Sequence, residues 1–273
     1  MNSLLTPKRI TVNGLAFNVL VEGEGPDVLL VHGFPDSHDV WRKQIPALVA
    51  AGYRVIAPDT RGCGDSEIAP GVSDYGLGIL VSDLAGILDA LGIDKVRLVG
   101  HDWGAAIGWA FCMRHPQRVD RYAALSVGHL TAYARGSLVQ KLKAWYVLMF
   151  QLPGLAEWVI RAWNWRFLRA FTGFAEEWPG WRRRAERPGR LTAGLNYYRA
   201  NRSLVLGRRL PDVPVPVMGV FSTGDRFLDE RQMMDSARYV RGPWRYERIE
   251  GVCHWLQLEA PERVNALLLD FFR

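Results

Sequence analysis

One carboxylate stands in a sequence context suited to nucleophilic chemistry. Asp102 is the central residue of Gly100-His101-Asp102-Trp103-Gly104, where an apolar stretch passes into a helical one. Glycines two residues before and after the centre permit a tight, strained strand-to-helix turn that projects the central side chain from the end of a sheet. The pattern alone also fits an ordinary strand-to-helix turn. A carboxylate at a strained turn can attack carbon and form an ester.

Two further residues follow later strand-like stretches in an order that supports this chemistry. Asp225 comes directly after Gly224, and His254 lies between Gly251 and Trp255. Nucleophile, acid and histidine in this chain order form one known arrangement of a catalytic triad. Taken singly, Asp225 also fits a turn or helix cap, and His254 fits a buried structural histidine. All three together favour the triad.

The elements that must position these residues alternate between short strands and helices. Continuous apolar runs rich in β-branched residues predict strands buried on both faces of a mainly parallel sheet. The predicted strands are Asp27–His32, Tyr53–Pro58, Lys95–Gly100, Arg121–Val127, Val217–Ser222 and Arg245–Ile249. The predicted helices are Asp39–Ala51, Tyr75–Leu91, Gly104–His115, Glu230–Tyr239 and Pro261–Phe272.

A helical insertion is expected to interrupt this alternation. Strand-like runs are absent from about residue 129 to 210, and six of the eleven tryptophans fall between Trp145 and Trp181. The sequence PDVPVP at 211–216 then supplies a turn before the α/β pattern returns. We therefore expect one discontinuous core domain, residues 1–128 and 211–273, and a helical cap or lid at 129–210.

The positive charge of the chain is concentrated in that insertion. The whole chain has a net charge of +6, whereas residues 135–209 alone carry +11. This fits a solvated helical surface and leaves open an anionic partner or a membrane surface. No helix-turn-helix, zinc-finger or RNP pattern accompanies the charge, so no nucleic-acid partner is expected. The Arg-rich stretch at 181–190 has no functional explanation from sequence.

Composition and cysteine spacing limit the class of protein. Among 273 residues 49% are hydrophobic, which suits a globular protein with one large core. Cys63, Cys112 and Cys253 lie far apart, which argues against a disulfide framework or thiolate metal site and favours a reducing cytoplasm. Met1–Gly14 lacks the apolar core of a secretory signal, and no apolar run approaches the roughly 20 residues of a membrane span. We expect no integral membrane association.

The remaining histidines give no metal-binding pattern. No pair among them has the spacing of a metal site, so neither a metal nor another cofactor is expected. These histidines are His38, His101, His115 and His129, while His32 is expected to form structural hydrogen bonds.

Several separate motifs resemble those of the α/β-hydrolase superfamily, and within it the epoxide hydrolases. The resemblance covers nearly the whole chain. His32-Gly33-Phe34-Pro35 is similar to the HGxP segment of that family, Asp59–Ser66 to its D-x-R-G-x-G-x-S turn, and residues 100–104 to its nucleophile motif. Two stretches of the insertion resemble its tyrosine-bearing segments. They are Tyr146 before Phe150-Gln151, and Tyr198 within Asn196-Tyr197-Tyr198-Arg199.

The resemblance implies an α/β-hydrolase fold and a role for each matching residue. It implies Asp102 as nucleophile, His254 as base and Asp225 as the acid that orients it. It also implies a ring-opening pair, Tyr146 and Tyr198, although Tyr146 lies in an aromatic run that also suits core packing and Tyr197 is an adjacent rival of Tyr198.

Further residues are expected around the reacting atoms. Backbone N–H groups of Phe34 and Trp103 are the candidate oxyanion donors. Four aromatic side chains are expected to contact substrate, namely Trp103, Phe34, Phe150 and Trp255.

The expected activity is hydrolysis of an apolar epoxide, with water, to a vicinal diol. Asp102 would form an alkyl ester, which a water activated by His254 would cleave. A haloalkane dehalogenase is the nearest alternative, but Phe34 has no side-chain donor for halide. Trp103 stands where a haloacetate dehalogenase would carry arginine. Another hydrolase and a non-catalytic protein that binds a hydrophobic ligand also remain open, as does the oligomeric state, a homodimer included.

Overall fold

A single mixed sheet forms the centre of the computed structural model, which describes residues 7–207 and 209–273. Its strand order is β1-β2-β4-β3-β5-β6-β7-β8. The strands are β1 (Lys8–Val12), β2 (Leu15–Glu22), β3 (Asp27–Val31), β4 (Arg54–Pro58), β5 (Val96–His101), β6 (Val119–Leu125), β7 (Val217–Ser222) and β8 (Trp244–Ile249). The expectation about Met1–Gly14 falls partly on residues 1–6, which lie outside the described residues.

The six strands predicted from sequence are the parallel part of this sheet. From β4 through β8 every neighbouring pair runs parallel. Val28, Leu29, Val99 and Ala124 are fully buried, as expected for strands covered on both faces. The predicted α/β class and mainly parallel sheet are confirmed.

An N-terminal hairpin was not predicted. Strands β1 and β2 run antiparallel, and β2 also pairs antiparallel with β4. Asn13 and Gly14 form the turn, with φ of 50° and 76°. Asn-Gly between two strands is a strong hairpin signal, because both residues tolerate positive φ. The signal was therefore present in the sequence.

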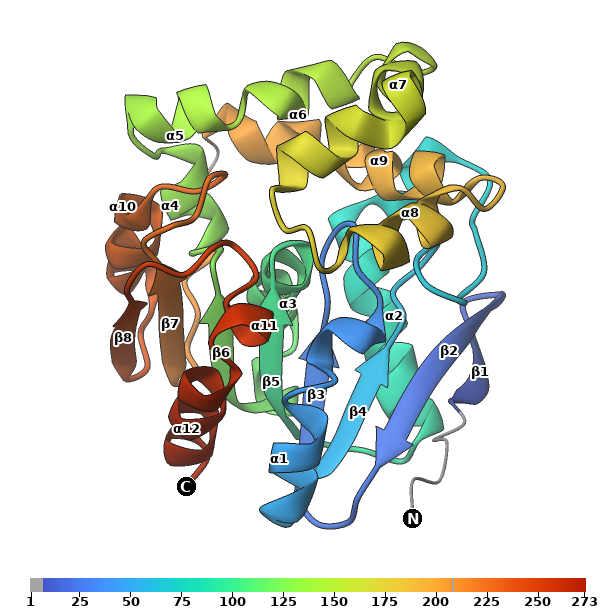
Figure 1. The fold of residues 1–273 in the computed structure, drawn as a ribbon. Helices are drawn as coiled ribbons and strands as arrows, with labels where there is room; N and C mark the ends of the chain where they lie inside the picture. Colours follow the sequence, from blue (N-terminus) through green and yellow to red (C-terminus); the bar gives the residue numbers. More distant parts are fainter. Residues whose placement is uncertain (1–6, 208) are drawn as a thin grey trace.

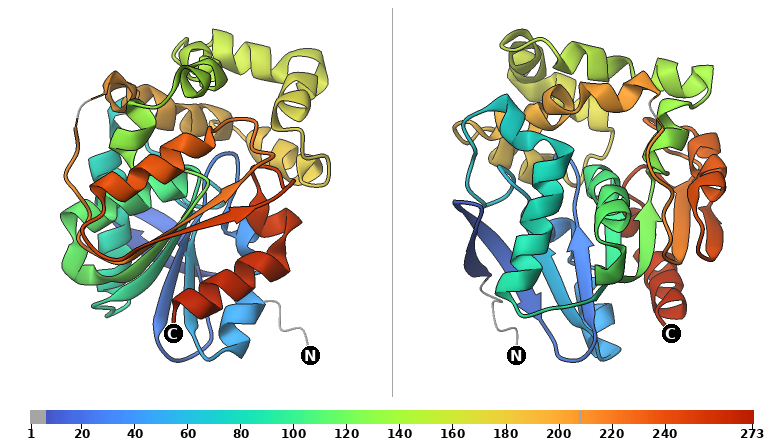
Figure 2. Two further views of the ribbon diagram at one scale, coloured as in Figure 1. Left: turned by 90° about the vertical axis from the view of Figure 1, so that its left-hand side faces the viewer. Right: turned by 180° about the vertical axis from the view of Figure 1, so that it is seen from behind.

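Helices cover both faces of the sheet. Helices α2 and α3 lie on one face, and α1 and α12 lie on the other (Figures 1 and 2). The helices outside the segment between β6 and β7 are α1 (Ile45–Ala50), α2 (Leu77–Ala90), α3 (Trp103–Arg114), α10 (Glu230–Met234), α11 (Leu256–Glu259) and α12 (Pro261–Phe271). The short 3-10 helices in the same part of the chain are η1 (His38–Trp41), η2 (Val72–Tyr75), η3 (Pro116–Arg118) and η5 (Asp235–Tyr239).

The predicted helix over Asp39–Ala51 was wrong in its extent. The chain forms η1, then a turn, and only then α1. Pro46 explains this start, because its ring has no N–H to donate and fits the first turn of a helix but not its interior. Likewise, the helix predicted over Glu230–Tyr239 ends as the 3-10 helix η5.

The segment between β6 and β7 is helical and lies across the carboxyl ends of the parallel strands (Figure 1). We call residues 129–210 the cap. Its elements are α4 (Leu130–Ala134), α5 (Leu138–Lys143), α6 (Trp145–Phe150), α7 (Leu155–Thr172), α8 (Trp178–Ala185), α9 (Arg190–Ala200) and η4 (Arg202–Leu206). Helix α7 is kinked at residues 162–165.

Across the described ranges, no helix is both long and apolar enough to cross a bilayer.

The Arg-rich stretch at 181–190 fastens the cap to the loops beneath it. Arg184 Nη1 lies 3.4 Å from a carboxylate oxygen of Asp39, and Arg187 Nη1 lies 2.7 Å from one of Asp65. Arg190 donates to the Ser66 carbonyl. These three arginines therefore have a structural explanation, which sequence analysis did not supply.

Candidate active site

Asp102 lies on a strained turn between β5 and α3. Its φ of 52° and ψ of −120° are rare for a residue with a side chain. A Cβ at position 104 would lie 1.9 Å from the carbonyl oxygen of Val31, and one at position 100 would lie 2.4 Å from that of Gly104. Only glycine therefore permits these close approaches, and the turn directs the Asp102 carboxylate to the carboxyl end of the sheet.

His254 and Asp225 lie beside Asp102, at the ends of two other strands. His254 Nδ1 donates to Asp225 Oδ2 at 2.7 Å, and its Nε2 lies 3.5 Å from Asp102 Oδ2. Asp225 Oδ1 accepts from the backbone N–H groups of Phe227 and Leu228, at 2.8 and 3.0 Å. The structure thus brings the three predicted residues together, with the imidazole between two carboxylates.

Electrostatics keep Asp102 ionised. Burial alone would raise the pKa of this carboxyl. The hydrogen bond and charge of His254, with a smaller contribution from the Phe34 N–H, outweigh burial and hold the pKa of Asp102 below its usual value. A carboxylate that stays ionised is available as a nucleophile.

The same carboxylates favour a protonated His254. Burial lowers its pKa, but Asp225 and Asp102 together outweigh this and raise the pKa of His254 from 6.5 to about 10. With Asp102 ionised, the imidazole is therefore a cation at neutral pH. Loss of the Asp102 charge would remove one of the two causes of the increase.

The oxyanion candidate Phe34 is also at the site. Its backbone N–H donates to Asp102 Oδ1 at 2.8 Å. A Cβ at the preceding residue, Gly33, would lie 2.4 Å from Asp102 Oδ1, so glycine is required there as well. Trp103, the second candidate, directly follows Asp102 as the first residue of α3.

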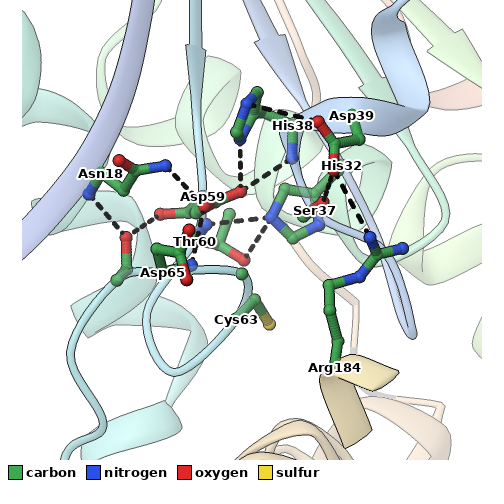
Figure 3. A network of polar contacts seen from close by, with 12 residues as sticks. Asn18, His32, Ser37, His38, Asp39, Asp59, Thr60, Cys63, Asp65 and Arg184 are labelled. Carbon is green, nitrogen blue, oxygen red and sulfur yellow. Dashed lines mark hydrogen bonds and ion pairs between the residues drawn. The ribbon is translucent and has the colours of Figure 1, made fainter. Parts of the chain in front are cut away.

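A polar network beneath the site fixes the loop that carries Phe34 (Figure 3). His32 Nε2 accepts from the Thr60 backbone N–H at 2.9 Å. Asp59 accepts from His38 Nδ1 at 2.8 Å and from the Asp65 backbone N–H at 2.8 Å. Despite its burial, these donors hold the pKa of Asp59 well below its usual range. The HGxP and D-x-R-G motifs thus hold two loops together.

His101 contacts His254 through both its ring and a hydrogen bond, and sequence analysis did not identify it as a site residue. Its Nε2 donates to the His254 carbonyl oxygen at 2.9 Å, and the two rings are 4.7 Å apart. Burial lowers the pKa of His101 to about 3, so this ring is neutral. Its position just before Asp102 was a signal in the sequence, but its partner lies 153 residues away.

A second buried carboxylate, also missed, links the cap to the loop of His254. Asp36 accepts from the indole N–H of Trp181 at 2.7 Å and from that of Trp255 at 2.9 Å. Burial outweighs these two donors and raises the pKa of Asp36 to about 6. Asp36 directly follows the HGxP segment, which was its only signal.

Two cavities meet at the predicted tyrosine pair. One has a volume of about 600 Å³ and the other of about 300 Å³, both open to solvent, and Asp102, Tyr146 and Tyr198 line both. The two phenol rings are 6.1 Å apart. Burial raises the pKa of both phenols well above 10, so they remain protonated donors. The carboxylate and both tyrosines therefore share one interior space.

Tyr197, the rival of Tyr198, is directed elsewhere. Its hydroxyl donates to the Arg61 carbonyl oxygen at 2.7 Å and lies 3.0 Å from Thr60 Oγ1. It lines neither cavity at Asp102. Of the two neighbouring tyrosines, only Tyr198 faces Asp102.

The predicted substrate contacts are not all placed at the cavities. Trp103 lines the larger one, and Phe34 and Trp255 line the smaller one. Phe150 is not among the lining residues of either cavity; its ring lies 4.9 Å from that of Tyr198, and its contact with substrate stays a prediction. Tyr133, which sequence analysis missed, lines the larger cavity.

No cluster of three candidate metal-binding side chains occurs within residues 7–207 and 209–273.

Comparisons with known proteins agree with this geometry. Residues 26–261 match the alpha/beta hydrolase fold family. Epoxide hydrolase 3 of Xenopus tropicalis is 32% identical over 97% of this chain and 77% of its own length, and Epoxide hydrolase A of Mycobacterium tuberculosis is 33% identical over 97% of each. The crystal structure of epoxide hydrolase VrEH1 from Vigna radiata superposes with a TM-score of 0.85 at 30% identity, covering 100% of this chain and 98% of that one.

The chain belongs to the α/β-hydrolase fold family, and within it to the group that contains these epoxide hydrolases.

The raised pKa of His254 predicts a pH dependence of stability. The folded-state pKa, about 10, exceeds the usual value of 6.5, so folding favours the protonated ring. The resulting stabilisation is complete below about pH 6.5 and disappears as pH rises through about 10. Chemical denaturation of wild type and His254→Gln should therefore give a difference in unfolding free energy that shrinks from pH 7 to pH 10. A constant difference over that range would contradict the assigned pKa.

Proposed function

We propose that this protein hydrolyses an apolar epoxide to a vicinal diol through an alkyl ester on Asp102. One observation carries the proposal, namely that the Asp102 carboxylate and the phenols of Tyr146 and Tyr198 line the same cavities. A nucleophile on one side of a substrate and two proton-bearing donors on the other match the needs of ring opening. The similarity to named epoxide hydrolases supports the same activity.

In the first step an Asp102 oxygen attacks one carbon of the epoxide ring. A C–O bond to the carboxylate forms, the ring C–O bond breaks, and the ring oxygen becomes an alkoxide. Tyr146 and Tyr198 donate hydrogen bonds to this oxygen, and one phenol gives it a proton. Both phenols hold their protons at neutral pH, so they serve as donors until negative charge develops.

Ester formation changes the protonation of His254. Alkylation neutralises Asp102, which is one of the two carboxylates that raise the pKa of the imidazole. The proton that His254 then gives up restores the phenol. A neutral Nε2, oriented by the bond from Nδ1–H to Asp225, becomes available as a base only after the ester exists.

In the second step His254 Nε2 takes a proton from water, and the resulting hydroxide attacks the ester carbonyl carbon. Backbone N–H groups of Phe34 and Trp103 stabilise the tetrahedral oxyanion, and loss of one such donor typically costs about 3 kcal/mol. Phe34 already donates to the oxygen that would become this carbonyl oxygen. The diol oxygen leaves with the proton held by His254, and the proton of the Asp102 carboxylic acid then passes to His254, which restores the carboxylate and the imidazolium.

The cavity lining points to an apolar substrate. Ala106, Val127, Leu130 and Leu228 line the larger cavity with few polar groups. An apolar epoxide loses little hydration there, whereas a charged one would be poorly solvated. Water is the second reactant.

The expected location of the protein is the cytoplasm. Its assembly state, a homodimer included, stays open.

The division of labour between the steps gives a direct prediction. His254→Gln should still form the ester, more slowly because Asp102 loses its paired cation, but should not cleave it, so intact mass spectrometry should show one substrate mass added to the protein. Asp102→Ala is the control and should remain unmodified in the same incubation. If His254→Gln stays unmodified with an epoxide that the wild type converts, His254 is not confined to ester cleavage.

The tyrosine pair should govern ester formation alone. In the His254→Gln background, Tyr146→Phe or Tyr198→Phe should slow adduct formation, and both together should slow it by about 10² to 10⁴. Tyr197→Phe is the matched control, because that hydroxyl bonds to Arg61 and Thr60, so its loss should lower stability by about 1 kcal/mol and leave the rate unchanged.

The same assay separates ring opening from halide release. Wild-type protein should produce diol from aryl or aliphatic epoxides and no halide from haloalkanes of similar size. A double Tyr146→Phe, Tyr198→Phe variant that alkylates as fast as its parent would leave the tyrosines as packing residues and favour the dehalogenase alternative.

A further inference from the structure

The outer helices of the cap expose many large apolar side chains. Nine of the twelve exposed large apolar residues described lie between Leu138 and Trp163. Leu142, Trp145, Leu148 and Trp158 are 66%, 52%, 73% and 67% exposed. They belong to α5, α6 and α7, which run along the side of the cap farthest from the sheet (Figures 1 and 2).

These residues repeat with helical spacing within each helix. Leu138 and Leu142 are four residues apart on α5, and Trp145 and Leu148 are three apart on α6, so each pair lies on one side of its own helix. The opposite side of α6 is also apolar and is occupied, since Tyr146 and Phe150 are buried against the site. Single exposed apolar residues are ordinary, but a contiguous patch marks a surface that binds something.

The charges around this face are of one sign. Lys141, Arg161, Arg166 and Arg169 are exposed and take part in no ion pair described within residues 7–207 and 209–273. Glu157 is the only acidic residue between 138 and 172, and it is held by Arg199 at 2.8 Å. The face therefore combines leucine and tryptophan with cations and offers no exposed carboxylate.

The combination of apolar side chains and cations favours one kind of binding partner over another. A second copy docked through the same face by a two-fold axis would bring these cations together. A bilayer surface containing anionic lipid instead pairs with the cations and accepts the apolar side chains at the headgroup boundary, where tryptophan is favoured.

We propose that the α5–α7 face of the cap docks on the surface of a bilayer that contains anionic lipid. Leu142, Leu148 and Trp158 insert at the boundary, while Lys141 and Arg166 lie at the level of the phosphates. The docking is peripheral and reversible, because a few side chains and charges hold it rather than a membrane span.

An open cavity beside this face shares lining residues with the site. It measures about 660 Å³, and its lining includes Lys143, Trp145, Phe167, Tyr146, Phe171 and Phe227. Those last three residues also line the smaller cavity at Asp102. A docked cap would place this cavity at the bilayer, with only Tyr146, Phe171 and Phe227 shared between it and the site, so an apolar epoxide dissolved in the bilayer would enter past these rings, an inference that rests on the proposed function.

Vesicle flotation without substrate tests the docking itself. Wild-type protein should float with vesicles of equal parts phosphatidylglycerol and phosphatidylcholine, not with phosphatidylcholine alone, and high salt should weaken the binding. Leu142→Glu and Leu148→Glu should each lower the apparent affinity at least about tenfold. Met234→Glu is the matched control, because Met234 is 53% exposed but lies on α10, and it should bind like wild type.

The charge contribution has its own pair of variants. Lys141→Gln with Arg166→Gln should weaken binding to anionic vesicles, whereas Lys43→Gln with Lys95→Gln, which remove two exposed cations outside the cap, should not. All variants should hydrolyse a water-soluble epoxide at the wild-type rate. Wild-type protein that binds the vesicles but hydrolyses no epoxide would count against the proposed function alone.

Three results would overturn the docking proposal. The first is wild-type protein that fails to float, and the second is Leu148→Glu that floats as well as wild type. The third is a dimer by light scattering that Leu148→Glu converts to a monomer without any vesicle binding, which would make the face a contact between copies.

Discussion

A negative charge on Asp102 must be maintained beside cavities that are mainly apolar. An unpaired carboxylate in such surroundings would take up a proton and lose its nucleophilicity. His254 supplies the opposing charge at 3.5 Å, the Phe34 N–H donates at 2.8 Å, and Asp225 in turn holds the imidazole. The glycines around the strained turn are needed because only they let the backbone approach closely enough for these contacts.

The second requirement is that the cap keeps a fixed position over the sheet, because the cap supplies Tyr146 and Tyr198 and the sheet supplies Asp102. Lys143 donates to the carbonyl oxygens of Asp225 and Leu228, at 2.7 and 2.5 Å, and so joins α5 to the loop of the triad acid. Asp36 joins α8 to the loop of His254 through two indoles. Helix α5 contacts the triad loop through Lys143 and also exposes Leu142 to solvent. Positioning of the site and the proposed docking therefore use opposite sides of the same layer of helices.

Local signals account for what the sequence predicted. The parallel strands, the turn at Asp102 and the order of the triad are each encoded within a few residues, because buried strands and glycine turns are short-range features. The contacts of Asp36, His101 and Lys143 were missed because their partners lie between 82 and 219 residues away and no local pattern encodes them. The aromatic run that contains Tyr146 and Phe150 likewise does not reveal which ring lines the cavity.

The central claim is that Asp102 forms a covalent ester, and the fate of oxygen tests it most directly. In a single turnover in ¹⁸O-water with enzyme in excess, the diol should contain no label, because its new oxygen comes from Asp102. The label should instead appear in the peptide that contains Asp102, and in the diol only after further turnovers. A first-turnover diol that carries ¹⁸O, with an unlabelled peptide, would show direct attack by water and contradict the account.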